Sequence, residues 1–186
     1  MSEVGSRIVV YGPAGSGKTT VAASIAGSIG IPHIELDAIF WLPDWVSKSW
    51  EQFREDVSIV LAQYPEGWVC DGNYSHVRDL VLPMADTVIW LRLPFPVVFW
   101  QLLRRTVSRS VKKEVLWGNN YESLRLAFFS RDSLLLYVIR RWRRHQRLIK
   151  RDLKEIPNQA RVIELHSAKE IEALLNTLGP DGSGTG

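Results

Sequence analysis

A glycine-rich stretch near the start of the chain is the first place where the sequence could do chemistry. It satisfies the pattern G-x-x-x-x-G-K-[ST] between Gly12 and Thr19. Glycines at these spacings let the backbone curl so that several N–H groups point at one anion. Lys18 is placed to reach the β- and γ-phosphates of a nucleotide, and the Thr19 hydroxyl to bind Mg²⁺. The residues predicted to bind ATP are Gly12, Pro13, Ala14, Gly15, Ser16, Gly17, Lys18, Thr19 and Thr20.

Two aspartates follow predicted strands and are candidates for metal and proton chemistry. Asp37 follows the strand-like residues 34–36, and Asp71 follows residues 68–70. A carboxylate there can hold a metal-bound water or take a proton from an attacking hydroxyl, although an aspartate in a loop can also cap a helix or a turn. We expect Asp71 to organise Mg²⁺ together with Thr19. Either aspartate could receive or orient the attacking hydroxyl.

Aromatic residues gather directly after Asp37. Phe40, Trp41, Trp45 and Trp50 could form a flat apolar wall for a base or another ring-shaped substrate. They could equally form a small core beneath a long loop, and the sequence does not decide between the two. We predict that Trp41 contacts the acceptor substrate.

Two single residues have plainer interpretations. Cys70 is the only cysteine and lies within a predicted strand, which is typical of a buried small hydrophobe. A disulfide within the chain is therefore excluded, and a reducing cytoplasm is the simplest setting. His33 lies between Pro32 and a predicted strand and is interpreted as a structural or surface residue.

The net charge of +3 hides an uneven distribution. Residues 101–154 hold fifteen lysines and arginines against four acidic residues, a net charge of +11, which leaves −8 for the rest of the chain. Cationic groups are needed around a migrating phosphoryl group, and arginine suits this role through its planar set of donors. Because successive helix positions are about 100° apart, the arginines between 140 and 147 cannot all face one site. We expect two to four of the fifteen basic residues to touch substrate.

These candidates must be positioned by alternating strands and helices. Strands are predicted at residues 7–11, 34–36, 68–70, 87–91 and 161–165, and the clearest helices at 19–29, 50–63 and 167–178. Such alternation is typical of an α/β fold with a mostly parallel sheet, which binds ligands beyond the carboxyl ends of its strands. With 46% hydrophobic and 23% charged residues in 186, the chain fits one domain, placed at residues 1–178, with a flexible tail at 179–186. No apolar run is long enough for a membrane span.

Several segments of the sequence resemble a known group of proteins. They are the glycine-rich loop, residues 36–41, the tract Asp71-Gly72-Asn73-Tyr74 and the tract Trp117-Gly118-Asn119-Asn120. They resemble the adenylate-kinase-like proteins of the P-loop kinase superfamily, and most closely the bacterial FlaR-like or "DNA topology modulation" proteins. The resemblance implies a three-layer P-loop NTPase fold with a five-stranded parallel sheet in the order 2-3-1-4-5. It also implies a mobile helical lid at about residues 107–130.

The resemblance assigns further residues to the acceptor. In nucleoside monophosphate kinases an Asp-Gly-Phe-Pro-Arg segment ends the third strand, and the matching segment here starts at Asp71-Gly72. The nearest arginine that follows is Arg78, which is the candidate for binding a phosphate of the acceptor. Asn73 lies in the same acceptor loop and is predicted to contact the substrate.

The resemblance also places arginines on both sides of the lid. Arg105 matches the family arginine on the helix before the lid, and Arg131 matches the one that starts the helix after it. A later family arginine falls near Arg140, Arg141 or Arg143. We expect Arg105 and Arg131 to close over the migrating phosphoryl group.

Together these features predict an enzyme, a phosphotransferase that uses ATP and Mg²⁺ to phosphorylate a nucleotide-like or other small-molecule acceptor. One alternative is a nucleic-acid-associated P-loop NTPase, which the basic segment indicates but no recognisable DNA-binding motif supports. Another is a nucleotide-binding regulator with low turnover. Nucleic acid is thus not the favoured partner, no membrane is expected, and a cytoplasmic location is expected. The sequence identifies neither the acceptor nor the oligomeric state.

Overall fold

The computed structural model describes residues 4–112, 115–121, 134–153 and 160–179. The strands are β1 (Arg7–Tyr11), β2 (His33–Glu35), β3 (Trp68–Asp71), β4 (Thr87–Leu91), β5 (Val115–Leu116), β6 (Asn120–Tyr121) and β7 (Arg161–Leu165). The α-helices are α1 (Lys18–Ile29), α2 (Leu36–Phe40), α3 (Trp50–Gln63), α4 (Arg78–Val81), α5 (Phe95–Lys112), α7 (Leu134–Asp152) and α8 (Ala168–Leu178). Short 3-10 turns cover Pro43–Trp45, Ser75–Val77, Leu82–Met84 and Trp117–Asn119. Among the described helices, none is long and apolar enough to cross a membrane.

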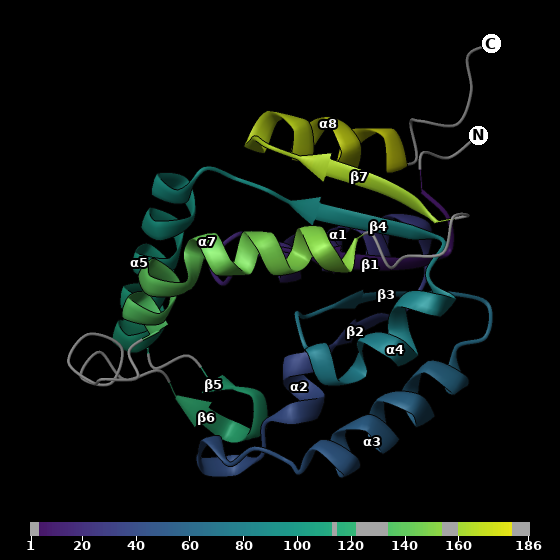
Figure 1. Ribbon diagram of the computed structural model, residues 1–186, viewed down its shortest axis with the longest axis horizontal. Helices are drawn as coiled ribbons and strands as arrows, with labels where there is room; N and C mark the ends of the chain where they lie inside the picture. The colour runs from purple at the N-terminus through teal and green to yellow at the C-terminus, as the bar shows by residue number, and fades with distance from the viewer. Residues whose placement is uncertain (1–3, 113–114, 122–133, 154–159, 180–186) are drawn as a thin grey trace.

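Five of the strands form one parallel sheet in the order β2-β3-β1-β4-β7 (Figure 1). This is the predicted order 2-3-1-4-5, because β7 is the fifth strand of the sheet and β5 pairs with β6 outside it. The register sets Val10 of β1 opposite Asp71 of β3 and Ile89 of β4. The carboxyl ends of the strands therefore share one edge, where the loops after β1, β2 and β3 meet.

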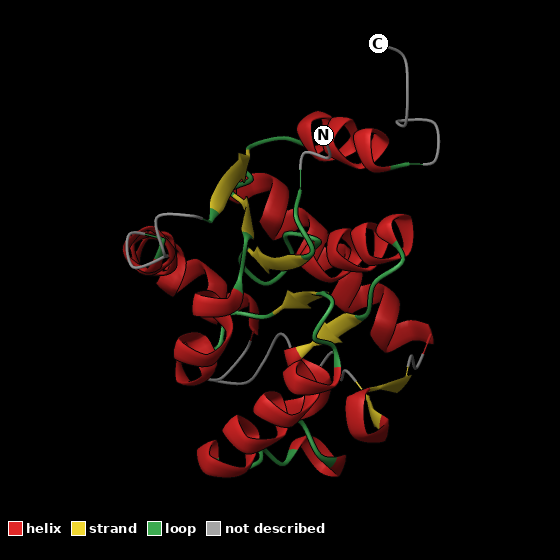
Figure 2. Ribbon diagram, turned by 90° about the vertical axis from the view of Figure 1, so that its right-hand side faces the viewer, coloured by secondary structure: helices red, strands yellow, loops and turns green. Residues whose placement is uncertain are grey.

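Helices cover both faces of this sheet, which gives the three predicted layers, as Figure 1 and Figure 2 show. Side chains of a strand alternate between the faces: Val9 and Tyr11 pack in the apolar cluster shared with α3 and α7, whereas Ile8 and Val10 pack in the one shared with α1 and α8. Because the central strands are buried on both faces, they form continuous apolar runs in the sequence. Cys70 of β3 is 1% exposed, which confirms its assignment as a buried small hydrophobe.

The second strand ends earlier than the apolar pattern predicts. The chain leaves β2 at Glu35 and turns into the short helix α2, whereas a strand was predicted through residue 36. Leu36 and Phe40 lie four positions apart and are both buried, so one face of α2 packs into the core. Asp37 therefore lies in the first turn of a helix, where a negative charge is favourable, and not at the end of a strand.

The expected lid at residues 107–130 is described only in part, and that part is not helical throughout. Helix α5 continues into it as far as Lys112, and residues 115–121 then form the antiparallel hairpin β5–β6. Gly118 and Asn119 in its turn have positive φ, in line with the turn-prone character of that tract. Residues 122–130 and Arg131 lie outside the described residues, as does most of the predicted tail.

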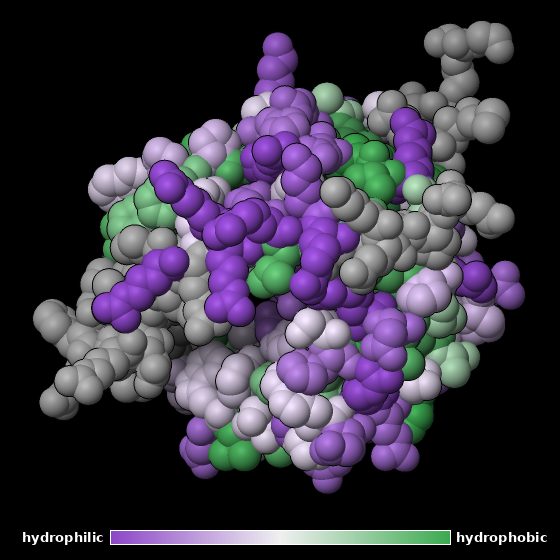
Figure 3. Space-filling model, in the orientation of Figure 1, coloured by the Kyte–Doolittle hydropathy of each residue, from purple (hydrophilic) through white to green (hydrophobic). Residues whose placement is uncertain are grey.

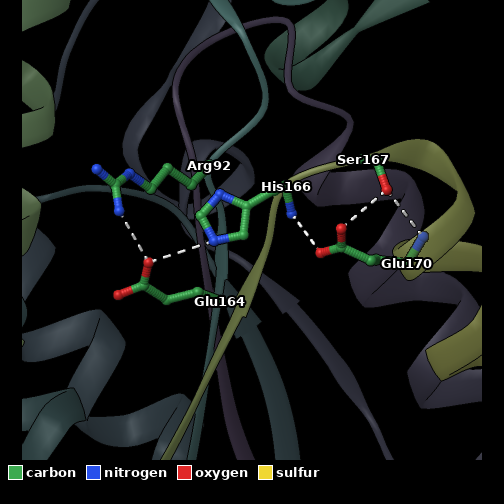
Figure 4. A network of polar contacts seen from close by, with 5 residues as sticks. All are labelled: Arg92, Glu164, His166, Ser167 and Glu170. Carbon is green, nitrogen blue, oxygen red and sulfur yellow. Dashed lines mark hydrogen bonds and ion pairs between the residues drawn. The ribbon is translucent and has the colours of Figure 1, made fainter.

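Polar contacts fasten the last strand and helix at the same edge of the sheet (Figure 4). The Ser167 hydroxyl accepts from the Glu170 N–H at 3.2 Å, and the Glu170 carboxylate accepts from the His166 N–H at 2.8 Å. Ser167 therefore caps α8, as predicted from the sequence, and the Glu170 carboxylate binds the N–H of the residue before the cap. Arg92 donates to Glu164 at 3.1 Å and so joins the end of β4 to β7.

Candidate functional site

The glycine-rich loop curls between β1 and α1 and lies against α5. Gly15 and Gly17 have φ of 87° and 84°, the left-handed region in which other residues are strained. A Cβ atom on Gly15 would lie 2.8 Å from the Val98 carbonyl oxygen and 2.7 Å from Leu102 Cβ, so α5 approaches the loop as closely as a glycine allows. Because α1 starts at Lys18, the first N–H groups of this helix and its dipole lie at the loop, as an anion site requires.

Asp71 lies beside the loop as the last residue of β3 and is only 2% exposed. The Thr19 hydroxyl donates to Asp71 Oδ2 at 2.6 Å. His33 Nε2 lies 3.1 Å from Asp71 Oδ1, a distance at which the ring N–H donates to the carboxylate. The structure thus brings the predicted metal pair together. His33, which was interpreted from the sequence as a structural or surface residue, contacts Asp71 directly.

The donor set at Thr19 and Asp71 fits Mg²⁺. A hydroxyl and a carboxylate are hard oxygen ligands, and Mg²⁺ in nucleotide sites takes one or two carboxylates together with phosphate oxygens and waters. Within the part of the chain that the structure describes, no three His, Cys, Asp or Glu residues are grouped closely enough to hold a metal ion. Thr19 and Asp71 offer one hydroxyl and one carboxylate, and octahedral Mg²⁺ has further positions for phosphate oxygens and water.

A cavity of about 770 Å³ opens beside the loop, a volume typical of small-molecule sites. The predicted residues that line it are Ala14, Gly15, Gly17, Lys18, Thr19, Thr20, Asp37, Trp41, Asn73, Arg78 and Arg105. Four predicted residues, Gly12, Pro13, Ser16 and Asp71, are buried and do not line it. The cavity therefore joins the loop side of the site to the side formed by α2 and the segment after β3.

On the side away from the loop, Asp37 is held by Tyr74. The Tyr74 hydroxyl donates to Asp37 Oδ1. Burial of Tyr74, and then the negative charge of Asp37, raise the pKa of the phenol well above its ordinary value, so it stays a donor. Asp37 is half-buried and lines the cavity. Its remaining lone pairs can accept a hydrogen bond from a bound hydroxyl group.

Glu35 and Trp117 are cavity residues that the sequence analysis missed. Trp117 Nε1 in the hairpin donates to Glu35 Oε2 at the end of β2, at 2.8 Å. Burial raises the pKa of Glu35, the hydrogen bond from Trp117 opposes the rise, and the charges of Asp71 and Asp37 add to it. Strand register could have identified Glu35, which pairs with Asp71 at the same edge. For Trp117, 82 residues away along the chain, the only signal was the resemblance that singled out its tract, and that resemblance gave it no role.

The aromatic cluster after Asp37 divides between cavity wall and core. Trp41 and Trp45 line the cavity, with their ring centres 5.6 Å apart in an edge-to-face arrangement. Phe40 is 5% exposed and belongs to the core, whereas Trp50 is 40% exposed and stacks on Phe40 from the surface, with ring centres 4.9 Å apart. Both interpretations left open by the sequence therefore apply, each to different members of the cluster.

Asn73 contacts the glycine-rich loop as well as the cavity. Its side-chain amide donates to the Gly12 carbonyl, and its side-chain oxygen lies 3.4 Å from the Gly12 nitrogen, which donates to it. These bonds join the segment after β3 to the start of the loop. The structure thus shows Asn73 positioning the loop, which its predicted role as a substrate contact did not include.

Helix α5 supplies cations to the cavity, whereas α7 presents most of its charge to solvent. Arg105 and Arg109, one turn apart on α5, line the cavity. From α7, the apolar residues Leu148 and Ile149 line it, and none of the described arginines of that helix does. The exposed arginines of α7 include Arg140, Arg143, Arg144 and Arg147. Hydrophilic side chains accordingly cover this face of the molecule over α7 (Figure 3).

Comparison with known proteins places this geometry in a broad class. A family model described as "ATPase family associated with various cellular activities (AAA)" matches residues 8–63. A cytidylate kinase of Streptococcus equi subsp. zooepidemicus is 33% identical over 60 residues, which cover 32% of this chain and 26% of that protein. The matched stretch thus spans about a quarter of that relative.

Solved structures resemble the whole chain. The shikimate kinase from Bacteroides thetaiotaomicron is 18% identical with a TM-score of 0.55, and the alignment covers 93% of this chain and 96% of that one. The shikimate kinase from Acinetobacter baumannii in complex with shikimate is 18% identical with a TM-score of 0.52, covering 95% and 92%. The chain therefore shares the fold of these solved kinase structures. The narrower resemblance to FlaR-like proteins stays a prediction.

Proposed function

We propose that the protein is a small-molecule kinase that transfers the γ-phosphoryl group of ATP, with Mg²⁺, to a hydroxyl group of a small acceptor. One observation carries the proposal: a single cavity is lined by Lys18 and Thr19 on one side and by Asp37 on the other. A phosphate donor and a hydroxyl acceptor bound there face each other, and such positioning is much of what phosphoryl transfer requires. The fold shared with shikimate kinases and the stretch shared with a cytidylate kinase support the same class of reaction.

On the donor side, the loop from Gly12 to Thr20 binds the phosphates of ATP. Its glycines and the start of α1 supply N–H donors, and Lys18 supplies a positive charge near the transferred group. Thr19 and Asp71 hold Mg²⁺, directly or through its water shell. Mg²⁺ held there would supply positive charge that offsets part of the charge on the phosphates.

On the acceptor side, Asp37 is the residue that receives the proton. Asp71 is buried, does not line the cavity, and has Thr19 and His33 as partners of its two carboxylate oxygens, so it is less available to take a proton from an acceptor. Asp37 faces the cavity and is oriented by Tyr74. As the acceptor oxygen forms its bond to the γ-phosphorus, its proton passes to the Asp37 carboxylate, and ADP leaves.

Cations complete the site around the transferred phosphoryl group. Arg105 and Arg109 of α5 line the cavity and are positioned to offer planar sets of donors to phosphate oxygens. Arg78 lines the acceptor side and is proposed to bind an anionic group of the acceptor. Arg131 keeps its predicted role at the phosphoryl group, although it lies outside the described residues.

A screen for acceptor-dependent ATP consumption tests this proposal. Nucleotides, nucleosides, sugars and small hydroxy acids are offered with Mg-ATP, and thermal shift is recorded in parallel. We expect at least one compound to raise the rate of ADP formation and the melting temperature together. ADP formation that no compound in the panel changes would argue for one of the low-turnover alternatives.

The exposed arginines of α7 favour one alternative function, that of a nucleic-acid-associated NTPase. They lie on the surface and none of the described ones lines the cavity, so they are accessible to an extended polyanion. Retention on DNA that falls steeply with salt, with a slope matching several phosphate contacts, would favour this alternative. Retention without ATP turnover in the presence of any acceptor would favour it over the kinase.

A further inference from the structure

The hairpin β5–β6 is fastened to the acceptor side of the cavity through Asn120. Asn120 is only 4% exposed. Its Nδ2 donates to the carbonyl oxygens of Leu42 at 2.8 Å and Trp117 at 2.6 Å, and its Oδ1 accepts from the Trp45 N–H at 2.8 Å. One buried amide therefore joins the hairpin to residues 41–47, and the hairpin lies beside α2 in Figure 1.

The segment that receives the hairpin has a strained backbone. Asp44 and Trp45 have φ of 59° and 56°, in the left-handed region, which aspartate tolerates but which is unfavourable for a bulky residue such as tryptophan. Such conformations persist where the surroundings hold them, and they gather at functional sites. Here Asn120 binds the Trp45 backbone, and the Trp45 indole N–H donates to the Tyr121 carbonyl at 3.2 Å. The hairpin thus determines where the Trp45 indole lies in the cavity.

The turn of the hairpin approaches the same segment so closely that it has room only for glycine. Gly118 has φ of 64°, and a Cβ there would lie 2.6 Å from the carbonyl carbon of Leu42. The tract Trp117-Gly118-Asn119-Asn120, which the sequence analysis singled out without a role, therefore has a shape that matches residues 41–47.

The same hairpin reaches into the cavity through Trp117. Its indole N–H donates to Glu35, and its ring lies edge-to-face with Trp45, ring centres 6.4 Å apart. A carboxylate has about four lone-pair sites, and this bond occupies one of them. Glu35 can therefore accept further hydrogen bonds from a ligand in the cavity.

We infer, building on the proposed kinase function, that hairpin β5–β6 is a wall of the acceptor site and that this wall selects a ring-shaped acceptor with hydroxyl or amino groups at its edge. The indoles of Trp41, Trp45 and Trp117 offer apolar planes against which a ring packs. Glu35 and Asp37 accept hydrogen bonds when ionised and so favour a ligand that donates. Nucleosides and cyclic polyols both have this chemistry, and the experiment separates them.

Calorimetric binding to the full chain, loaded with Mg²⁺ and a non-hydrolysable ATP analogue, tests the selection. Adenosine and cytidine are the nucleoside probes, and D-glucose and myo-inositol are the cyclic polyol probes. Glycerol and D-sorbitol are acyclic controls that also carry hydroxyl groups. We expect at least one ring probe to bind about tenfold or more tightly than the acyclic controls. Acyclic compounds that bind as well as the rings, or no binding by any ring probe, would overturn the inference.

A matched pair of variants tests the wall itself. Trp117→Phe keeps an aromatic ring and removes the donor to Glu35, and Trp100→Phe makes the same change at a residue that is 66% exposed and does not line the cavity. We expect Trp117→Phe to bind the tightest-binding ring probe about tenfold more weakly and to bind the ATP analogue with unchanged affinity. Trp100→Phe should change neither. Equal affinity of the ring probe for Trp117→Phe and the unaltered chain would overturn the inference.

Amide hydrogen exchange in the ligand-free chain tests the attachment of the hairpin. Asn120→Ala removes the acceptor of the Trp45 N–H, and we expect this amide to exchange about tenfold faster. Unchanged exchange at residues 41–47 would mean that the hairpin does not hold them. These readouts are independent of turnover. A chain that binds rings but transfers no phosphoryl group would therefore refute the proposed function and leave this inference standing.

Discussion

Asp37 and Asp71 differ in their surroundings, and that difference supports the different roles proposed for them. Asp71 is buried, with Thr19 and His33 on its two oxygens. Asp37 faces the cavity and accepts a hydrogen bond from the Tyr74 hydroxyl. The sequence analysis assigned Asp71 to Mg²⁺ but left open which aspartate receives the proton, because the burial of a carboxylate depends on partners from distant segments.

Substituting the two aspartates should give different metal dependences. Asp71→Asn keeps the shape of the side chain and removes the charge near Mg²⁺, so we expect turnover to fall by about 10²–10³-fold and more Mg²⁺ to be needed for half-maximal rate. Asp37→Asn should lower kcat by about 10²–10⁴-fold with an unchanged Mg²⁺ requirement. Turnover measured across a Mg²⁺ titration checks both. If Asp71→Asn kept most of its activity at saturating Mg²⁺, Asp71 would be structural only.

Glu35 should make folding stability depend on pH. Burial raises the pKa of Glu35 above its ordinary value of 4.5, so the folded chain holds this proton more tightly than the unfolded chain. The stability that results is present in full below pH 4.5 and is lost as the pH rises through the raised pKa. Glu35→Gln abolishes this titration and still offers an oxygen to Trp117.

Thermal unfolding of Glu35→Gln and the unaltered chain at several pH values checks this sign. Between about pH 4 and pH 7 the difference in melting temperature should move in favour of Glu35→Gln, because the unaltered chain alone loses stability there. A difference that stays constant over this range would show that Glu35 titrates alike in the folded and unfolded chain.

At the scale of elements, the sequence predicted the parallel sheet well and the acceptor side poorly. The five strands of the sheet were identified because strands buried on both faces are continuous apolar runs bounded by polar residues. The glycine-rich loop was identified because its chemistry lies within eight consecutive residues. Helix α2 was taken for the end of a strand, since Leu36 and Phe40 reveal a helical face only over a single turn.

The contacts of hairpin β5–β6 could not be predicted for a different reason. Trp117 and Asn120 contact Glu35 and Leu42, which lie 82 and 78 residues away along the chain. No local pattern reports such pairings. The tract was singled out by resemblance alone, and its place in the cavity follows only from the three-dimensional arrangement.

Two glycines of the loop should differ in their tolerance of alanine. Gly15 and Gly17 have nearly the same φ, so alanine at either costs about 1–2 kcal/mol of backbone strain. A Cβ at Gly17 meets open space, whereas one at Gly15 meets the backbone of Val98 and Leu102. Gly15→Ala should therefore lower the free energy of unfolding, measured with denaturant, by about 1–3 kcal/mol more than Gly17→Ala does. Equal losses would show that α5 does not press on the loop.

At the scale of the whole molecule, the basic segment separates into two surfaces. Arg105 and Arg109 of α5 line the cavity, and the exposed arginines of α7 face solvent. The concentration of positive charge in residues 101–154 therefore does not translate directly into charge at the site. Only part of it can act on a bound nucleotide.

Charge reversal on α7 should separate polyanion binding from catalysis. We expect Arg143→Glu combined with Arg147→Glu to leave phosphoryl transfer within about threefold, because both side chains are exposed and lie outside the cavity lining. Any retention on DNA should weaken. The slope of the logarithm of affinity against the logarithm of salt concentration should become less negative by about 0.9 for each phosphate contact removed. Loss of turnover in this variant with the fold intact would place α7 in the catalytic site.

The central claim is that ATP turnover is coupled to phosphorylation of a small acceptor in one cavity. The most direct measurement follows ADP by coupled assay and the phosphorylated acceptor by mass spectrometry in the same reaction. We predict equal amounts of the two products for the unaltered chain. We predict loss of both in Lys18→Ala, by about 10²–10³-fold and with an unchanged melting temperature, because Lys18 faces the cavity and not the core. ADP formed without any phosphorylated acceptor, or turnover retained in Lys18→Ala, would contradict the account.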